Sequence, residues 1–277
     1  MKKILVPIDF SRSSLNAAYF ACKIAQKNDS HLIFLHAYRV PLNNTFVPAT
    51  VINHVAFERE KEAIQEFRAY MVKYLKTQLT KEELPPMKFE LQYGFATDII
   101  QERAVHYDTS LIIMGTNGAD SVWDKMMGSI TSNIIKHSQV PVLAVPVTAT
   151  YNDFEKIVYA TDFDKKDIET LKRVEEFANL FDAEIGLLHI APPNDNQDWY
   201  KASLLGDDLN SESLGDLPIY NIENNNVLEG IEHFINNNQF DLLAVLTHSK
   251  NFFENLLQTS VTKKLALRTH IPILAYH

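Results

Sequence analysis

The chain repeats itself, and this repeat restricts the possible folds more than any other feature of the sequence. The segment EKIVYATDF (155–163) aligns with KKILVPIDF (2–10) at a constant offset of 153 residues, without a gap, through Leu35-His36 and Leu188-His189. The later parts of the two copies align at an offset of 131, so the second copy is shorter in its middle. Repeated segments of this length indicate duplicated domains. We therefore expect one domain over residues 1–148 and a second over residues 153–277.

Each copy begins with a pattern that is typical of a parallel β-sheet. ILVPIDF (4–10) and HLIFLHAY (31–38) are short apolar runs, as in strands that are buried on both faces. Between them, LNAAYFACKIA (15–25) has apolar residues at helical spacing, and Ser11 or Ser13 can cap that helix. Strand, helix and strand within about 35 residues make a βαβ unit, which implies parallel strands and a right-handed crossover.

The rest of the first copy continues the alternation of strands and helices. Residues 39–53 contain two prolines and are predicted to be a loop. The further elements predicted are helices over 54–79 and 96–107, an edge strand over 87–94, and buried strands over 110–115 and 140–146. In the second copy, a polar and acidic segment (195–216) replaces the long helix.

Composition and charge limit which binding partners and which cellular compartments we expect. The net charge of −9 argues against nucleic acid or an anionic membrane as the main partner. The single cysteine, Cys22, lies in an apolar helical pattern, which fits a buried thiol in a reducing compartment. The N-terminal apolar run ends at Asp9, too early for a signal peptide, and no run approaches the roughly 18–20 apolar residues of a transmembrane helix. We expect a soluble, cytoplasmic protein.

A cluster of glycines marks a candidate anion site. The chain has only 8 glycines, yet Gly115, Gly118 and Gly128 fall within fourteen positions, between an apolar strand and a helix-compatible segment. Glycine permits positive φ and close approach to a ligand, and a helix N-terminus presents unpaired N–H groups. Asp9 ends the first strand and would face the same cleft if the first and fourth strands are neighbours. The alternatives are an ordinary β–α loop, an Asp9 that only caps the turn, and Ser129 and Thr131 as plain helix residues.

Several motifs together closely resemble the universal stress protein family. They are PIDFS after the first strand, LHA after the second, and Gly-x2-Gly-x9-Gly-Ser followed by VPVLAVP, and the repeat resembles the family's tandem form. The resemblance implies an α/β fold of two tandem Rossmann-like, adenine nucleotide alpha-hydrolase-like domains. Each would be a five-stranded parallel sheet of order 3-2-1-4-5 flanked by helices. The glycine spacing is that of the family's ATP-binding branch, so the implied ligand is ATP, with or without Mg²⁺.

The resemblance also implies a role for individual residues. The adenosine end would be lined by Pro7, Ile8 and Asp9, with Ala37 touching the base through its backbone. Ribose and phosphates would lie against Gly115 and Gly118, with Met114 beside them, and the terminal phosphates against Gly128, Ser129 and Ile130. Thr131 stands where this branch often has a hydroxyl. The chain departs from the pattern at Ile8, where a small or polar residue is frequent.

The second copy has lost the three glycines. Leu246, Ser249 and Thr259 replace them, and a Cβ at each place hinders positive φ and close approach to phosphate. We therefore expect one nucleotide per chain, held by the first domain. A metal site that combines Asp162 with histidines 189 and 248 is a minor alternative, because histidines near strand ends are usually hydrogen-bonded structural groups. The same interpretation applies to the histidine at position 36.

Three functions stay open. The leading one is an adenine-nucleotide-binding regulatory protein of the stress response. The second is an enzyme of the same fold that slowly hydrolyses ATP or transfers a nucleotidyl group, although the chain has no Walker motif, no glycine loop after the first strand and no assignable catalytic residue. The third is a nucleotide-free interaction scaffold. In each case we expect the halves to pair through strands 140–146 and 271–276, as two chains would in a homodimer.

Overall fold

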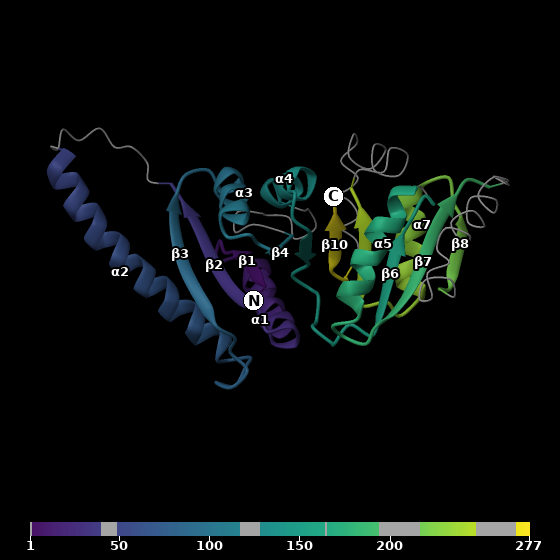
Figure 1. The fold of residues 1–277 in the computed structure, drawn as a ribbon, viewed down its shortest axis with the longest axis horizontal. Coiled ribbons are helices and arrows are strands. Elements are labelled where there is room, and N and C mark those ends of the chain that lie inside the picture. Colours follow the sequence, from purple (N-terminus) through teal and green to yellow (C-terminus); the bar gives the residue numbers. More distant parts are fainter. Residues whose placement is uncertain (1, 40–48, 117–127, 164, 194–216, 248–269) are drawn as a thin grey trace.

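A single β-sheet runs through both halves of the chain. The computed structural model describes residues 2–39, 49–116, 128–163, 165–193, 217–247 and 270–277, with the backbone alone described for 49–60 and 165–166. Within these residues the strands form a 10-stranded sheet of order β3-β2-β1-β4-β5-β10-β9-β6-β7-β8 (Figure 1). Read from its outer edge inward, each half has the order 3-2-1-4-5. The fold is therefore α/β with two tandem Rossmann-like domains, as the sequence predicts.

The elements follow the predicted alternation. The first half contains β1 (Lys3–Pro7), α1 (Arg12–Asn28), β2 (His31–Tyr38), α2 (Ala49–Leu75), β3 (Met87–Tyr93), α3 (Ala96–His106), β4 (Leu111–Gly115), α4 (Ser129–His137) and β5 (Val142–Val145). The second half contains β6 (Lys156–Ala160), α5 (Lys165–Ala178), β7 (Glu184–Ala191), β8 (Ile219–Glu223), α7 (Val227–Asn237), β9 (Leu242–Leu246) and β10 (Ile273–Tyr276). The acidic segment 195–216 lies outside the described residues.

Several element boundaries differ from the prediction, most of all those of α2, which was predicted over 54–79, and the end of β1. Helix α2 begins at Ala49, so residues 49–53 are helical and not part of a loop. Pro48 directly precedes it, and proline, with its fixed φ and missing N–H, is well suited to a helix start. Strand β1 ends at Pro7 and not at residue 10, because the chain turns sharply at Phe10, whose φ is +64°.

The strand order places a topological switch point between β1 and β4. Strand β1 pairs in parallel with β2 on one side and with β4 on the other. The connections that follow β1 and β4 therefore lie on opposite sides of this point, and open α/β sheets bind their ligands at the carboxyl ends of such a strand pair. The halves meet at β5 and β10, which pair antiparallel with Leu274 opposite Leu143.

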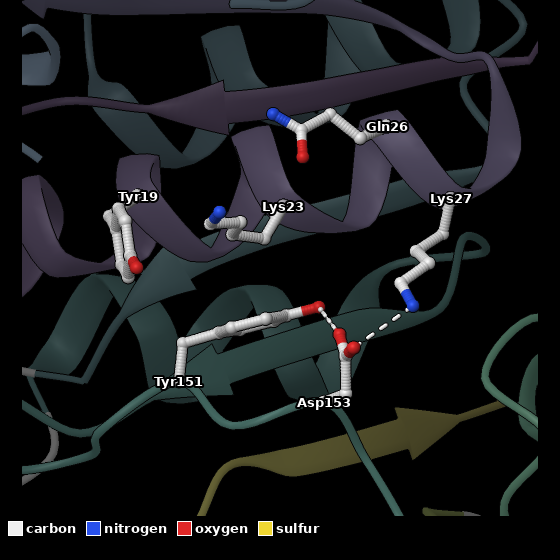
Figure 2. Close-up of a pocket in the computed structure, with 6 residues that line it drawn as sticks. All are labelled: Tyr19, Lys23, Gln26, Lys27, Tyr151 and Asp153. Carbon is white, nitrogen blue, oxygen red and sulfur yellow. Dashed lines mark hydrogen bonds and ion pairs between the residues drawn. The ribbon is translucent and has the colours of Figure 1, made fainter. Parts of the chain in front are cut away.

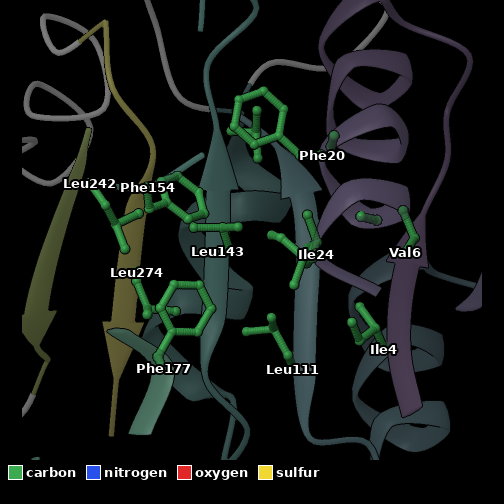
Figure 3. Packing of buried hydrophobic residues seen from close by; sticks show 14 of the residues in the cluster. Ile4, Val6, Phe20, Ile24, Leu111, Leu143, Phe154, Phe177, Leu242 and Leu274 are labelled. Carbon is green, nitrogen blue, oxygen red and sulfur yellow. The ribbon is translucent and has the colours of Figure 1, made fainter. Parts of the chain in front are cut away.

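Helices cover both faces of the sheet, and alternate strand residues enter two cores. On one face, Ile4 and Val6 of β1 pack in a cluster with Phe20 and Ile24 of α1 (Figure 3). On the other face, Leu5 belongs to the cluster that includes residues of α3, α4 and α7. The first cluster crosses the domain boundary, because the ring of Phe154 lies 6.5 Å from that of Phe20 and between 5.0 and 5.9 Å from the rings of Phe181 and Phe177.

Helix α1 also holds the linker between the halves. The side-chain amide of Asn16 donates to the carbonyls of Pro146 and Ala149, each at 2.9 Å. Helix α1 therefore contacts the sheet with one side and the linker with the other. Among the described helices, none is long and apolar enough to cross a lipid bilayer.

Candidate nucleotide site

The turn after β1 is built by local hydrogen bonds. The Asp9 Oδ1 atom accepts from the backbone N–H of Ser11 at 3.0 Å and from the Ser11 hydroxyl at 2.5 Å. Ser11 is in turn the N-cap of α1, because its Oγ accepts from the N–H of Ser14. One of the two predicted caps is thereby confirmed. Asp9 thus caps the turn, which was the alternative to a role in ligand binding. Its side chain is also exposed, at the carboxyl end of β1.

Both polar backbone groups of Ile8, the N–H and the carbonyl, form hydrogen bonds. Its N–H donates to the carbonyl of Leu35 at 2.8 Å, and its carbonyl accepts from Nδ1 of His36 at 2.7 Å. Its side chain is buried in the core. The amide hydrogen of Ile8 is therefore committed within the fold, and the carbonyl already accepts one hydrogen bond.

The aromatic residue after Asp9 has the same unusual conformation in both halves. Phe10 has a φ of +64° and its ring lies 4.8 Å from that of His36. Phe163 has a φ of +56° and its ring lies 4.9 Å from that of His189, whose Nδ1 donates to the carbonyl of Thr161. Both histidines are thus structural groups, as predicted. Because the second half keeps this turn without the glycines, the strain at phenylalanine belongs to the strand-to-helix turn itself.

Gly115 is required by close packing. A Cβ atom at Gly115 would lie 2.5 Å from the carbonyl carbon of Ser13 and 2.7 Å from both the Ser13 Oγ and the Ser14 nitrogen. The first turn of α1 therefore presses directly on the end of β4. Our expectation of a positive φ is wrong here and at Gly128, since among the described glycines only Gly94 has one. Glycine is needed at position 115 because α1 and β4 pack too closely to leave room for a side chain.

The N-terminus of α4 faces the same edge of the sheet. Gly128 is its N-cap, with φ −59° and ψ 150°, and its N–H donates to the carbonyl of Thr116. The first N–H groups of a helix have no partner inside it, and a glycine cap has no side chain to offer them. Ser129 and Ile130 of this turn are exposed, and the turn carries no acidic residue. Amide donors and the positive end of the helix dipole therefore suit an anion.

Thr131 joins this helix to β4. Its hydroxyl donates to the carbonyl of Gly115 at 2.8 Å, and the residue is only 4% exposed. The hydroxyl predicted to lie near phosphate is thus used inside the fold. Met114, one residue before Gly115, is buried in the core on the α4 side, so its side chain packs with apolar residues.

The remaining predicted residues are spread over the same edge. Pro7 ends β1 opposite Leu35, and Ala37 lies half-buried near the end of β2, paired with Gln92 of β3. Gly118 lies outside the described residues, so its place in the site stays a prediction. The structure thus brings Asp9, Gly115 and the start of α4 to one edge of the sheet.

From the sequence, Ser11 and Ser13 are only candidate helix caps, and their connection of these groups was missed. Ser13 is 2% exposed, lies against Gly115, and its Oγ is 3.1 Å from that of Ser11. The two hydroxyls are within hydrogen-bonding distance, and either oxygen can be the donor. The signal was present in the run Ser-Arg-Ser-Ser directly after Asp9-Phe10, which places hydroxyls on successive positions of a helix start.

A separate hollow lies far along α1, at the linker. It has a volume of about 360 Å³ and is lined by Tyr19, Lys23, Gln26, Lys27, Tyr151 and Asp153 (Figure 2). Its charges pair with neighbouring side chains: Lys27 with Asp153 at 3.0 Å and Lys23 with Glu83 at 2.7 Å. The hydroxyl of Tyr151 also donates to Asp153. This hollow is a junction that holds α1 to the linker, and its cations are already neutralised.

At the equivalent edge of the second half, the described side chains pack or pair within the fold. Leu246, in the place of Gly115, is buried in the core. Tyr159 and Thr161 each donate to the buried carboxylate of Asp167 at 2.6 Å. Burial, with the nearby Asp167 charge, raises the pKa of Tyr159 well above its usual value, so the phenol stays a hydrogen-bond donor. Positions 248, 249 and 259 lie outside the described residues, and the minor metal interpretation goes untested with them.

Known proteins that are shorter than this chain are similar in sequence to part of it. A universal stress protein from Staphylococcus saprophyticus is 26% identical over 164 residues, which are 58% of this chain and 93% of the relative. One from Staphylococcus aureus is 25% identical over 166 residues, 60% of this chain and 96% of the relative. These relatives therefore match a little more than one half of the chain.

Solved structures of tandem length share the fold. A universal stress protein from Archaeoglobus fulgidus superposes with a TM-score of 0.70 at 14% identity, covering 99% of this chain and 95% of that one. One from Pseudomonas aeruginosa gives a TM-score of 0.63 at 15% identity, covering 100% and 93%. The sequence model of the universal stress protein family matches residues 1–146 and again residues 153–277. The chain belongs to the universal stress protein family, in its tandem two-domain form.

Proposed function

We propose that the first domain binds an adenine nucleotide, ATP, and that the protein acts as a nucleotide-dependent regulator in the stress response. One observation carries the proposal: the N-terminus of α4, which has no side-chain cap, is held at the end of β4 by Thr131, on the sheet edge that also carries the exposed Asp9 at the end of β1. An anion site and a carboxylate at opposite ends of one crevice suit a ligand with a polyphosphate and a nucleoside.

The two ends of the site would bind different parts of the nucleotide through different kinds of hydrogen bond. At the phosphate end, the backbone amides of Ser129 and Ile130 would donate to oxygens, next to the Gly128 amide that is bonded to Thr116, which matters because the net charge of −9 repels anions at long range. Gly118 would add its backbone to this group of phosphate-binding amides. At the nucleoside end, Asp9 would accept from a ribose hydroxyl or the base amino group, beside Pro7, Ile8 and the backbone of Ala37. A triphosphate held by amides needs no metal-binding side chain, so Mg²⁺ would enter as the counterion of the ATP.

We further propose that the units 1–148 and 153–277 are domains that stay paired in solution. The pairing of β5 with β10 and the aromatic packing of Phe154 across the boundary support this. Two sheet edges cover each other in this arrangement, which removes exposed hydrogen-bonding groups from solvent.

The proposal is tested by calorimetric titration with ATP of the wild type, Gly118→Val and Ser249→Val. The two variants change equivalent positions of the two halves. We expect wild-type affinity for Ser249→Val and loss of binding for Gly118→Val, with an unchanged circular dichroism spectrum. Wild-type affinity for ATP in Gly118→Val would contradict the proposed role of Gly118 in holding the phosphates. Mass spectrometry of ligand released from the denatured wild type gives an independent reading of which nucleotide it carries.

A further inference from the structure

A chain of contacts connects the two ends of the proposed nucleotide site. It runs from Asp9 through the hydroxyls of Ser11 and Ser13, across the packing of Ser13 on Gly115, to the hydroxyl of Thr131. Each step joins a different element: the turn after β1, the start of α1, the end of β4 and the start of α4. The positions of the adenosine end and the phosphate end are thereby set relative to each other.

The hydroxyl of Thr131 cannot donate to a phosphate while it holds this contact. A threonine hydroxyl has one hydrogen, and that hydrogen points to the Gly115 carbonyl at 2.8 Å. What remains on the oxygen are lone pairs, which repel phosphate oxygens. Thr131 is also only 4% exposed, whereas Ser129 and Ile130 in the same turn are exposed. Its effect on a ligand must therefore pass through the helix.

The Gly115 carbonyl, which accepts the hydrogen bond from Thr131, has little freedom to move. Gly115 has no room for even a Cβ against the backbone of Ser13 and Ser14, so the end of β4 is fixed on α1. A second bond, from the Gly128 N–H to the Thr116 carbonyl, holds the N-cap of α4 beside the same strand end. These two contacts hold the first turn of α4 against the end of β4.

We propose that Thr131 is a positioning residue that aims the first-turn amides of α4 at the terminal phosphates. The inference rests on the proposed function, because it assigns a role within the same site. The loss of the hydroxyl would free the helix start and leave the buried Gly115 carbonyl without a donor. The cost would fall on phosphate binding, while the Asp9 end would keep its geometry.

The test compares ATP and adenosine binding to four proteins by titration calorimetry: the wild type, Thr131→Val, Thr131→Ser and Thr262→Val. Thr131→Val keeps the shape and removes the hydroxyl, and Thr262→Val makes the same change at the equivalent position of the second half. We expect Thr131→Val to weaken ATP about three- to tenfold, the range for one lost hydrogen bond, with adenosine affinity unchanged. Thr131→Ser should restore ATP affinity, and Thr262→Val should leave it intact.

The possible results separate the inference from the proposed function. Equal ATP affinity in Thr131→Val and the wild type would overturn the positioning role. Equal weakening of ATP and adenosine would also overturn it, because that pattern is expected from a general loss of folded structure. A wild type that binds no ATP would overturn the proposed function itself. If Thr131→Val unfolds below the titration temperature, Thr131→Ala takes its place with the same ratio of ATP to adenosine affinity as the readout.

Discussion

Replacing Gly115 with alanine should destabilise the protein, although the exchange of glycine for alanine usually does the opposite. At a position with ordinary φ, alanine stabilises a fold by about 0.4–1 kcal/mol, because it reduces the entropy of the unfolded chain. Gly115 is not among the glycines with positive φ, so this gain applies to it. The sign of the effect therefore depends on whether the new methyl group fits.

The structure shows that the methyl group does not fit. It would lie 2.5 Å from the Ser13 carbonyl carbon and 2.7 Å from the Ser14 nitrogen, which are backbone atoms and cannot rotate away. Since carbon atoms prefer separations of about 3.5–4.0 Å, the first turn of α1 must move by about 1 Å. Overpacking of this kind costs about 1–3 kcal/mol, which exceeds the entropic gain.

Urea denaturation followed by circular dichroism measures the effect, with Gly128→Ala as the matched control. Gly128 has φ −59° and ψ 150°, which any residue adopts, and alanine is only a poorer N-cap there. We expect Gly128→Ala to lose less than about 1 kcal/mol and Gly115→Ala to lose more. A Gly115→Ala variant as stable as the wild type would refute the close-packing explanation.

Three further predictions concern the site, the sheet and the core. Asp9→Ala should weaken ATP and adenosine by similar factors, about 1–3 kcal/mol for each, in calorimetric titration; a loss for ATP alone would place Asp9 at the phosphates. Hydrogen exchange should be slow in both β5 and β10, and fast exchange in residues 273–276 would contradict stable pairing of the halves. Burial raises the pKa of Cys22 from 9.0 to about 12, so the thiol should resist alkylation at pH 8 until urea unfolds the chain. Because the folded pKa is the higher one, this thiol stabilises the fold below pH 9 and loses that contribution as the pH rises from 9 towards 12, measurable as a falling urea midpoint.

The fold was predictable because its signals are local and repeated. Strand β2 was predicted residue for residue, since a run of apolar residues bounded by polar ones has few alternatives. The edge position of β3 followed from its alternating pattern, and the Ser11 cap from the hydroxyls after the first strand. The start of α2 was missed because proline was taken as a loop signal, when it also favours the first turn of a helix.

The sheet edge that carries the candidate residues was predictable, whereas the contacts of these residues were not. The spacing of glycines indicates a crevice, but the reason for Gly115 depends on where α1 packs, which no local pattern states. For Thr131, the sequence indicates a hydroxyl near phosphate, and only the packed structure directs that hydroxyl to a carbonyl sixteen positions away in sequence. The Tyr159–Asp167 contact of the second half was missed for the same reason, since each residue alone is an ordinary strand or helix residue.

The most direct test of the account is the stoichiometry of ATP binding to the intact chain. Both halves have an aspartate after the first strand and a Ser-x-Thr sequence at the matching later position, so these motifs alone would suggest two sites. The structure argues for one, because the second half has Leu246 buried in its core where the first half has Gly115. Calorimetric titration should give about one ATP per chain, lost in Gly128→Val and retained in Thr259→Val. Two equivalent sites, or one site that survives Gly128→Val and disappears in Thr259→Val, would contradict the assignment to the first domain.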